Sequence, residues 1–185
     1  VGGREVTKTV RVDADPRIQM AAADYQAQLA GALEVRDLVS QVNGVIDRTE
    51  DLRKQLAGLV EQLQRPVAAA ASDGNDGAAA DSAALAAVKR VLDQVNDLRG
   101  RLNRPPPRMG YRQYPRLREE LQSLGGAISR PVAPPTESQQ RRLGELRQET
   151  TAVVGELNQL VTQTVPELNR LLGGRPHIIA GAPLR

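Results

Sequence analysis

The sequence predicts an all-α protein in which long helices run up and down in a bundle. Apolar residues recur at alternating steps of three and four along four separate segments, and this spacing places them on one face of a helix. Aromatic residues make up only 2% of the 185 residues, with no Trp and no Phe. The core must therefore be built from Leu, Val, Ile and Ala, which suits helix packing better than a β-sandwich or a barrel. A chain of this length is one domain, alone or with an appendage.

The composition excludes several classes of function. The basic residues number 25, of which 22 are Arg, and the net charge of +3 is too small an excess to indicate nucleic acid by itself. The absence of Cys excludes disulfides and thiolate chemistry. No apolar run approaches ~18 residues and no signal-peptide pattern begins at Val1, so we expect no membrane span. The chain begins without Met, as a processed protein or an excised fragment would.

The N-terminal segment predicts one short β-strand. Between Arg4 and Asp13 the β-branched residues are dense and partly alternate, as in Val6, Val10 and Val12. One strand leaves its ladder groups unpaired, so it either pairs with a sheet outside this chain, which we favour, or lies as an arm along the bundle. Asp15-Pro16 ends the extended segment. Residues 1–16 are thus expected to be a strand and linker from a preceding β segment.

The first predicted helix spans about residues 21–64 and contains the longest heptad run. Tyr25, Leu29 and Leu33 are expected to lead into it. At 1.5 Å per residue the helix would be on the order of 65 Å long, which is too long to be stable unless other helices cover its apolar face. The residues on that face are Val35, Leu38, Val42, Val45, Thr49, Leu52, Leu56, Leu59 and Leu63.

Two shorter helices are predicted next, at about 82–103 and 111–129. A small-residue loop from Val67 to Asp81 precedes the first, with Asp81 or Ser82 as its N-cap. Three prolines at 105–107 separate the two helices. The apolar faces are Ala84, Val88, Val91, Val95, Leu98 and Leu102 in one, and Tyr114, Leu117, Leu121, Leu124 and Ile128 in the other.

The last helix is predicted at about 136–172, which completes a bundle over residues 17–174. Thr136 and Gln139 fit a capping box at its start, and Gly173-Gly174 end it. Pro166 should bend or interrupt it. The tail, 175–185, is expected to be frayed or to form a short strand. The apolar face is Leu143, Leu146, Thr150, Val153, Leu157, Leu160, Thr164, Leu168 and Leu171.

Two arrangements of these helices fit the sequence. In the first, which we favour, the two short helices stand side by side in a four-helix bundle with the two long ones. In the second they stack end to end around the proline break, as one interrupted middle helix of a three-helix bundle.

An arginine-rich turn between the two short helices is the one candidate binding site. Seven arginines lie in the segment from Arg99 to Arg118, which contains no acidic residue. Tyr111 and Tyr114 lie among them. Such a turn would bind an anionic partner or, with less support, nucleic acid; the alternative that we favour is a solvated turn. The candidate contacts are Arg101, Arg104, Arg108, Arg112 and Arg116.

The chain offers no recognisable catalytic, cofactor or metal site. His177 is the only His and has no acidic or Cys residue at ligand spacing. The pairs Glu119-Glu120 and Glu145/Glu149 are typical of exposed helix faces, because a di-metal bundle would need Glu-x-x-His units. With one His there is no Ser-His-Asp set. We therefore expect no enzyme activity, no cofactor and no small-molecule substrate.

Several short motifs resemble one family of bacterial proteins. They are D-P-R at 15–17, A-A-D-Y-Q-A-Q-L at 22–29, D-L-R-K-Q-L at 51–56, P-T-E-S-Q at 135–139 and V-P-E-L-N-R-L-L at 165–172. In this order they resemble the C-terminal region of large secreted proteins whose main body is a sortilin-like β-propeller of BNR (Asp-box) repeats, often labelled glycosyl hydrolase. The resemblance covers almost the whole chain.

The resemblance implies a helical C-terminal domain of an exported protein, located outside the cytoplasm. No Asp-box repeat, S-x-D-x-G-x-T-W, can be written from these residues, so the hydrolase label does not transfer to this chain. Its expected role is structural support or protein-protein interaction, with the propeller or other subunits as partners. The alternative is an independent binding module that contacts an anionic partner through the arginine-rich turn.

Overall fold

The computed structural model describes residues 6–13, 15–65, 75–105 and 113–184, with only the backbone of 75–80, and it confirms an all-α fold. No β-strand forms in these ranges. The helical segments are α1 (Ala22–Gln64), α2 (Asn75–Leu102), α3 (Leu117–Ser129), α4 (Glu137–Gln159), the π-helical turn η1 (Leu160–Thr164) and α5 (Val165–Leu172).

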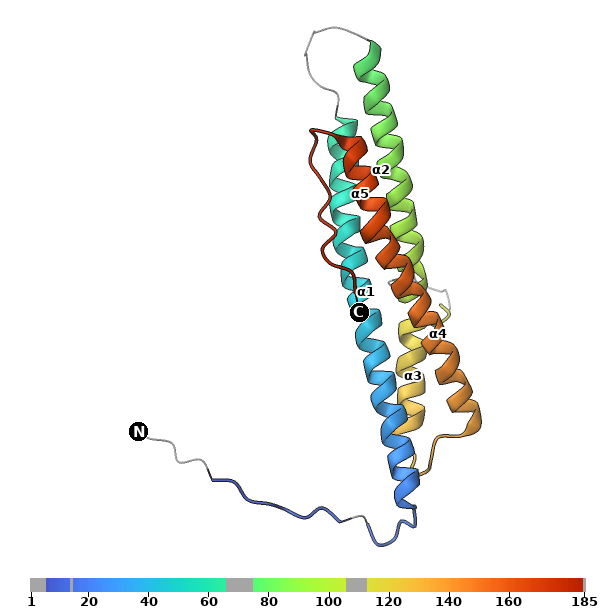
Figure 1. Ribbon diagram of the computed structural model, residues 1–185. Helices are drawn as coiled ribbons and strands as arrows, with labels where there is room; N and C mark the ends of the chain where they lie inside the picture. Colours follow the sequence, from blue (N-terminus) through green and yellow to red (C-terminus); the bar gives the residue numbers. More distant parts are fainter. Residues whose placement is uncertain (1–5, 14, 66–74, 106–112, 185) are drawn as a thin grey trace.

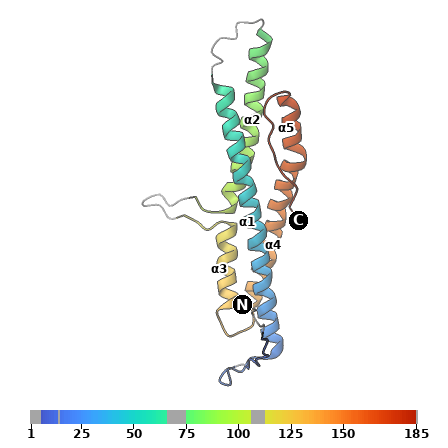
Figure 2. The ribbon, with the colours of Figure 1, turned by 90° about the vertical axis from the view of Figure 1, so that its left-hand side faces the viewer.

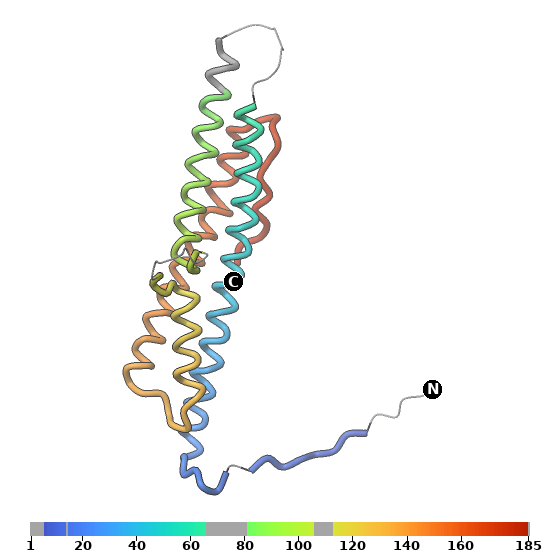
Figure 3. Tube along the Cα trace, turned by 180° about the vertical axis from the view of Figure 1, so that it is seen from behind, coloured from blue at the N-terminus to red at the C-terminus, as the bar shows by residue number. Residues whose placement is uncertain are grey.

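The helices form a long bundle in which α1 is the common element. α2 runs antiparallel to α1 beside its C-terminal half, and α3 continues in the same direction beside the N-terminal half (Figures 1 and 2). α4, η1 and α5 then run back along the whole length (Figure 3). The structure therefore has the end-to-end arrangement and not the side-by-side one that we favoured. The reason is coverage: α2 and α3, with 28 and 13 residues, in line nearly match the 43 residues of α1.

The core consists of the predicted apolar faces. Eight of the nine predicted positions of α1 are buried, from Val35 to Leu59, and Leu63 is partly buried. Every predicted position of α2 is buried, and so are the four of α3 from Leu117 to Ile128. Two core residues are polar, and each hydroxyl donates to a carbonyl of its own helix: Thr49 to Ile46 at 2.9 Å and Thr150 to Leu146 at 2.8 Å. The hydroxyls of these two buried residues are thus satisfied.

The start of α1 departs from the predicted pattern. Tyr25, Leu29 and Leu33 were expected in the core, but 36%, 59% and 39% of their surfaces are exposed. Steps of three and four backwards from Val35 lead to position 28 instead, which Gln28 occupies. Its side-chain amide donates to the carbonyl oxygens of Ile128 (2.9 Å) and Pro131 (2.5 Å), so this end of the bundle is held by hydrogen bonds.

Two helix starts also differ from the prediction. α2 begins at Asn75, within the predicted loop, because Ala78, Ala79 and Ala80 are the strongest helix formers. Asp81 and Ser82 are therefore inside the helix and do not cap it. α3 begins only at Leu117, since Pro115 disfavours helical geometry at the residue before it. Tyr114 consequently lies outside the helix and is 82% exposed.

The capping box that opens α4 is confirmed. The Gln139 amide N–H donates to the Thr136 hydroxyl at 3.3 Å, and the Thr136 N–H donates to the Gln139 side-chain carbonyl at 2.8 Å. At the C-terminal end of the continuous α4–η1–α5 helix, Gly173 has a φ of 62°, a conformation that favours glycine. It ends α5 as predicted.

The segment predicted as a strand is an extended arm that projects from the bundle (Figure 1). Residues 6–13 form no strand, because no second strand pairs with them in the described ranges. Asp15 ends the arm with a turn: its backbone carbonyl accepts from Ile18 N–H at 2.9 Å, and its carboxylate accepts from Arg17 N–H at 2.9 Å. The Arg17 side chain also donates to this carboxylate and lowers the pKa of Asp15.

The C-terminal tail is neither frayed nor a strand. It leaves α5 at Gly173, reverses direction and lies in extended form along the bundle (Figure 1). Ile178 is only 5% exposed and belongs to the core, and Ala180 and Leu184 pack against it partly buried. The tail is therefore a structural part of the bundle.

The packing of α3 on α1 is testable with an engineered disulfide. A Cβ atom at position 125 would lie 3.8 Å from Cβ of Val35, about the mean separation in disulfides. Because the chain has no Cys, the variant Val35→Cys/Gly125→Cys should oxidise to one intramolecular disulfide. We expect a mobility shift on non-reducing gels and a higher melting temperature when oxidised, with up to about 4 kcal/mol of stabilisation from the closed loop.

The matched control moves one cysteine by a single position. In Val35→Cys/Gly126→Cys the second Cβ faces the Arg130 side chain of its own helix, at 3.8 Å from Nε. This variant should oxidise far more slowly. Equal rates for the two pairs would contradict the observed α1–α3 packing.

Candidate functional site

The π-helical turn before Pro166 changes which residues of the last helix face the core. The Val165 N–H donates to the Leu160 carbonyl, five residues back, so the turn holds one extra residue. The extra residue rotates the following helix, and α5 buries Val165 and Leu172. The predicted core positions Thr164 and Leu171 move outward, and Leu171 is 51% exposed. The helix thus passes Pro166 without a break, but two of the buried positions after the turn are shifted by one residue from the predicted ones.

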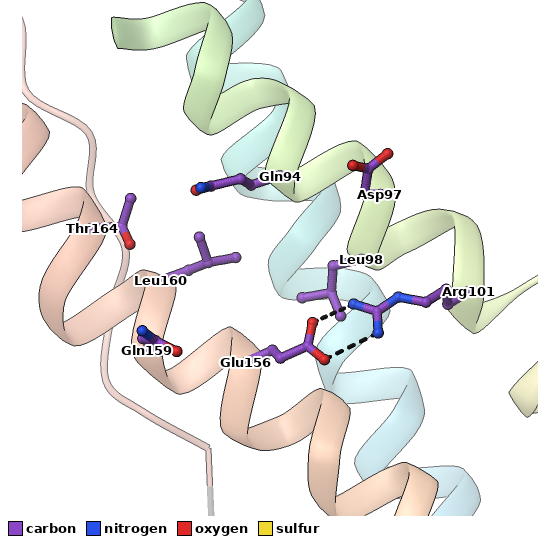
Figure 4. Close-up of a pocket in the computed structure, with 8 residues that line it drawn as sticks. All are labelled: Gln94, Asp97, Leu98, Arg101, Glu156, Gln159, Leu160 and Thr164. Carbon is purple, nitrogen blue, oxygen red and sulfur yellow. Dashed lines mark hydrogen bonds and ion pairs between the residues drawn. The ribbon is translucent and has the colours of Figure 1, made fainter.

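A groove lies between α2 and the α4–η1–α5 helix. It consists of two adjacent hollows of about 300 and 280 Å³ that share Gln94 and Thr164. Figure 4 shows the first hollow, with side chains from α2 facing those from α4 and η1. α4 packs mainly against α1 and only sparsely against α2, whereas α5 packs against α2, and the groove lies along this seam. The first hollow is lined by Gln94, Asp97, Leu98, Arg101, Glu156, Gln159, Leu160 and Thr164. The second is lined by Ala87, Arg90, Val91, Gln94, Thr164, Glu167, Leu168 and Leu171.

An ion pair bridges the two walls in the first hollow. Arg101 Nη1 donates to Glu156 Oε1 at 3.0 Å, and Nη2 donates to Oε2 (Figure 4). The guanidinium lowers the pKa of Glu156, although partial burial opposes the shift. Both side chains are about half exposed, at 51% and 45%. The lining of the first hollow thus combines the buried Leu98 and Leu160 with the polar side chains of this ion pair.

The structure places the predicted arginine contacts in different surroundings. Arg101 lies in the last turn of α2 and pairs with Glu156. Arg104 follows α2, where its backbone N–H donates to the Glu119 carboxylate at 3.2 Å and its Nε lies 3.7 Å from it. Arg116 is the exposed residue before α3. Arg108 and Arg112 lie outside the described residues. Carboxylates of the bundle thus neutralise two of the five predicted contacts.

The carboxylate pairs noted in the sequence have structural roles. Glu119 caps α3 by accepting from the Arg116 N–H at 2.9 Å. Glu120, Glu145 and Glu149 all bind Arg142, which joins α3 to α4 and whose pKa they raise. Arg142 and the four glutamates are therefore all bonded to other groups within the fold.

His177 lies in the C-terminal tail, where its ring meets the backbone that ends α5. His177 is exposed, and its Nε2 lies 2.9 Å from the Gly173 carbonyl oxygen. Across the ranges that the structure describes, no three His, Cys, Asp or Glu side chains are placed to hold a metal ion. No helix in the same ranges has the length and apolar character to cross a membrane.

Sequence reasoning missed the groove, although one signal for it was present. Pro166 lacks the N–H that would bond within the helix, and a π-turn is one way to pass such a residue. The hollows also depend on how α4 packs against α1 and how α5 packs against α2. This packing has no signal in the sequence.

Comparison with known proteins found no match to this chain among protein-family models, curated proteins or solved structures. The resemblance to exported propeller proteins therefore stays a prediction.

The Arg101–Glu156 pair predicts a specific dependence of stability on pH. Because the folded state lowers the pKa of Glu156 below its ordinary value of 4.5, the pair stabilises the fold above this pH, and the stabilisation is lost as the pH falls through the lowered pKa. Glu156→Gln should reduce stability at pH 7 by less than about 1 kcal/mol, since the pair is half exposed. Below pH 4.5 its melting temperature should approach that of the wild type.

Thermal melts from pH 7 to pH 3 measure this effect. Glu137→Gln is the control, because the Glu137 side chain is 85% exposed and 3.5 Å from its partner Arg141. The control should follow the wild-type profile. A Glu156→Gln profile parallel to the wild type over the whole range would contradict the role given to the pair.

Proposed function

We propose that this chain is a non-catalytic helical module that gives structural support and makes protein-protein contacts within a larger β-rich protein. The observation that carries the proposal is the arm, residues 6–13. Val6, Val10 and Val12 are 72%, 77% and 92% exposed. In an extended chain these even-numbered residues lie on one side, and Thr7 and Thr9 lie on the other. Lys8 lies on the same side as the valines, so the arm has a mainly apolar side, with one lysine, that the bundle leaves uncovered.

A sheet of a neighbouring domain is the partner that suits this arm. An extended segment supplies unpaired N–H and C=O groups to a sheet edge, and its alternate side chains enter the core of the partner. Burial of three valines would contribute about 1.5–3 kcal/mol each. The turn at Asp15 then fixes how the arm enters α1. The bundle would thus be joined to its partner through a short, directed connection.

The resemblance noted above supports an exported β-propeller protein with BNR repeats as the parent, which would place the module outside the cytoplasm. Under this proposal any hydrolase activity belongs to the parent and not to this chain. The residues encoded before Val1 provide a direct test. Asp-box repeats there would support the parent, and a coding sequence without them would exclude it.

The apolar side of the arm gives a mutational test in the parent protein. The triple variant Val6→Asp/Val10→Asp/Val12→Asp places three charges where we expect a sheet core. We expect limited proteolysis to separate the bundle from the parent at least tenfold faster, because the arm no longer docks. The melting temperature of the isolated chain should stay unchanged, since the bundle does not contact these side chains.

The control variant Thr7→Asp/Thr9→Asp puts charges on the other side of the arm and should leave the proteolysis rate close to that of the parent. Equal acceleration by both variants would argue against a docked strand. Deletion of the whole module should impair folding or assembly of the parent. If folding, assembly and partner capture were unchanged, the proposal would be wrong.

Binding of an anionic partner through the arginine-rich turn is the second proposed function. Its support is the exposed Arg116 side chain and the half-exposed Arg104. The test is binding to vesicles that contain phosphatidylserine. Affinity should fall steeply with salt, and Arg108→Glu/Arg112→Glu/Arg116→Glu should abolish it. Binding that is insensitive to salt, or that survives the charge reversal, would exclude this function.

A further inference from the structure

The C-terminal tail occupies a second groove as an extended peptide. This groove lies between α1 and the α4–α5 helix, and the tail runs through it from the end of α5 towards the middle of the bundle (Figures 1 and 2). The tail segment in the groove comprises residues 178–184. It forms no hydrogen-bonded ladder with another strand. Its backbone N–H and C=O groups must therefore find other partners.

Side-chain amides supply most of these partners. Three amides each bind one tail residue through both backbone groups: the amide carbonyl accepts from the N–H, and the amide NH₂ donates to the C=O. They come from both walls of the groove. The pairs are Asn169 with Ile178, Gln55 with Ile179, and Asn158 with Leu184, at distances of 2.8 to 3.1 Å. The Arg48 guanidinium donates to the Ala180 carbonyl as well.

These contacts recognise an extended backbone and not a particular sequence. Every one of them ends on a main-chain N–H or C=O, which all residues other than proline offer. An amide that bonds both groups of one residue also fixes the direction and the register of the bound chain. The groove is therefore built to hold an extended peptide, whatever side chains point away from it.

Three positions of the peptide are nevertheless restricted. The first, Ile178, is buried to 95% of its surface, since it is 5% exposed. The fourth, Gly181, has a φ of 70°, and a Cβ atom there would overlap the Arg48 guanidinium. The seventh, Leu184, lies 3.5 Å from the position of a Cβ at Gly44. The groove thus requires an aliphatic residue, then glycine, then an apolar residue.

The seventh position has space that the tail does not use. A hollow of about 280 Å³ lies beside Leu184 and is lined by Ser40, Gln41, Gly44 and Val154. A larger side chain at this position would bury more apolar surface than leucine does. This chain contains no Phe, so a phenylalanine at this position would come from another protein.

We propose that the α1–α4–α5 groove is a binding site for an extended peptide of a partner protein, with an aliphatic residue, a glycine three positions later and a phenylalanine three positions after that. The chain's own tail fills the site with the same pattern and gives way to the better-fitting peptide. This inference rests on the tail and its amide contacts, and it is independent of the arm and of the parent protein.

Fluorescence anisotropy on the full chain tests the site. We expect the Gly181→Ala variant to release the tail, because a Cβ atom strains the positive φ and displaces the Arg48 guanidinium that donates to the Ala180 carbonyl. The probes are a labelled peptide with the sequence of residues 175–185 and a second one with Phe in place of Leu184. We expect the variant to bind both, and to bind the Phe peptide about tenfold more tightly. The wild type should bind at least tenfold more weakly than the variant, since its tail competes.

Adding Asn158→Ala to the released variant removes two backbone contacts and should weaken peptide binding about tenfold. Gln159→Ala is the matched control, because this neighbouring amide lines the other groove and should leave the affinity unchanged. A Gly181→Ala chain with a wild-type circular dichroism spectrum that binds neither peptide would overturn the proposal. So would equal affinities for the Leu and Phe peptides.

Hydrogen exchange on the wild-type chain provides a measurement that needs no variant. Excess Phe peptide should accelerate exchange of the Ile179 and Leu184 amides, because it displaces the tail that the groove protects. Unchanged exchange at saturating peptide would contradict the proposal. A concentration-dependent dimer that the peptide dissociates would assign the groove to the tail of a second copy instead, and would exclude the partner peptide.

Discussion

The apolar face of α1 is the constraint on which the rest of this structure depends. Val42, Val45, Leu52 and Leu56 have no exposed surface, although they lie on a single helix of 43 residues. Such a helix is unstable unless its apolar face is covered along its whole length. α2 and α3 cover one side in succession, and the α4–η1–α5 helix covers the other. The tail closes the remaining gap by burying Ile178.

The path of the α4–η1–α5 helix along the bundle also explains the two grooves. The π-turn at 160–164 lets one long helix pass Pro166, but it moves Leu171 out of the core and into the lining of the second hollow. Both hollows between α2 and the α4–η1–α5 helix lie beside this turn, and both include Thr164. On the other side of the same helix, the space beside α1 is filled by the tail. The α4–η1–α5 helix thus borders an open groove towards α2 and a groove filled by the tail.

The two extended segments of the chain, the arm and the tail, differ in their contacts with the bundle. The tail meets amides from α1, α4 and α5 that bind its backbone, so it is held against the bundle. The arm meets no such groups in the described ranges, and its valines stay exposed. This contrast underlies both proposals: the arm is the part that reaches towards a partner, and the groove under the tail is the part that receives one.

The sequence by itself determined the fold class, the four helical segments and nearly all core positions, because a repeat of three and four residues on a helix has only one face to bury. It also determined the capping box at Thr136 and the stop at Gly173. Only the tertiary structure decided whether the two middle helices stand side by side or in line, since both arrangements bury the same residues and differ only in how much of α1 they cover. The π-turn, the groove and the amide contacts to the tail were decided in the same way. Asn158, Asn169 and Gln55 are ordinary polar positions of their helices, and they bind the backbone of the tail only because the packing of the helices brings them to one line.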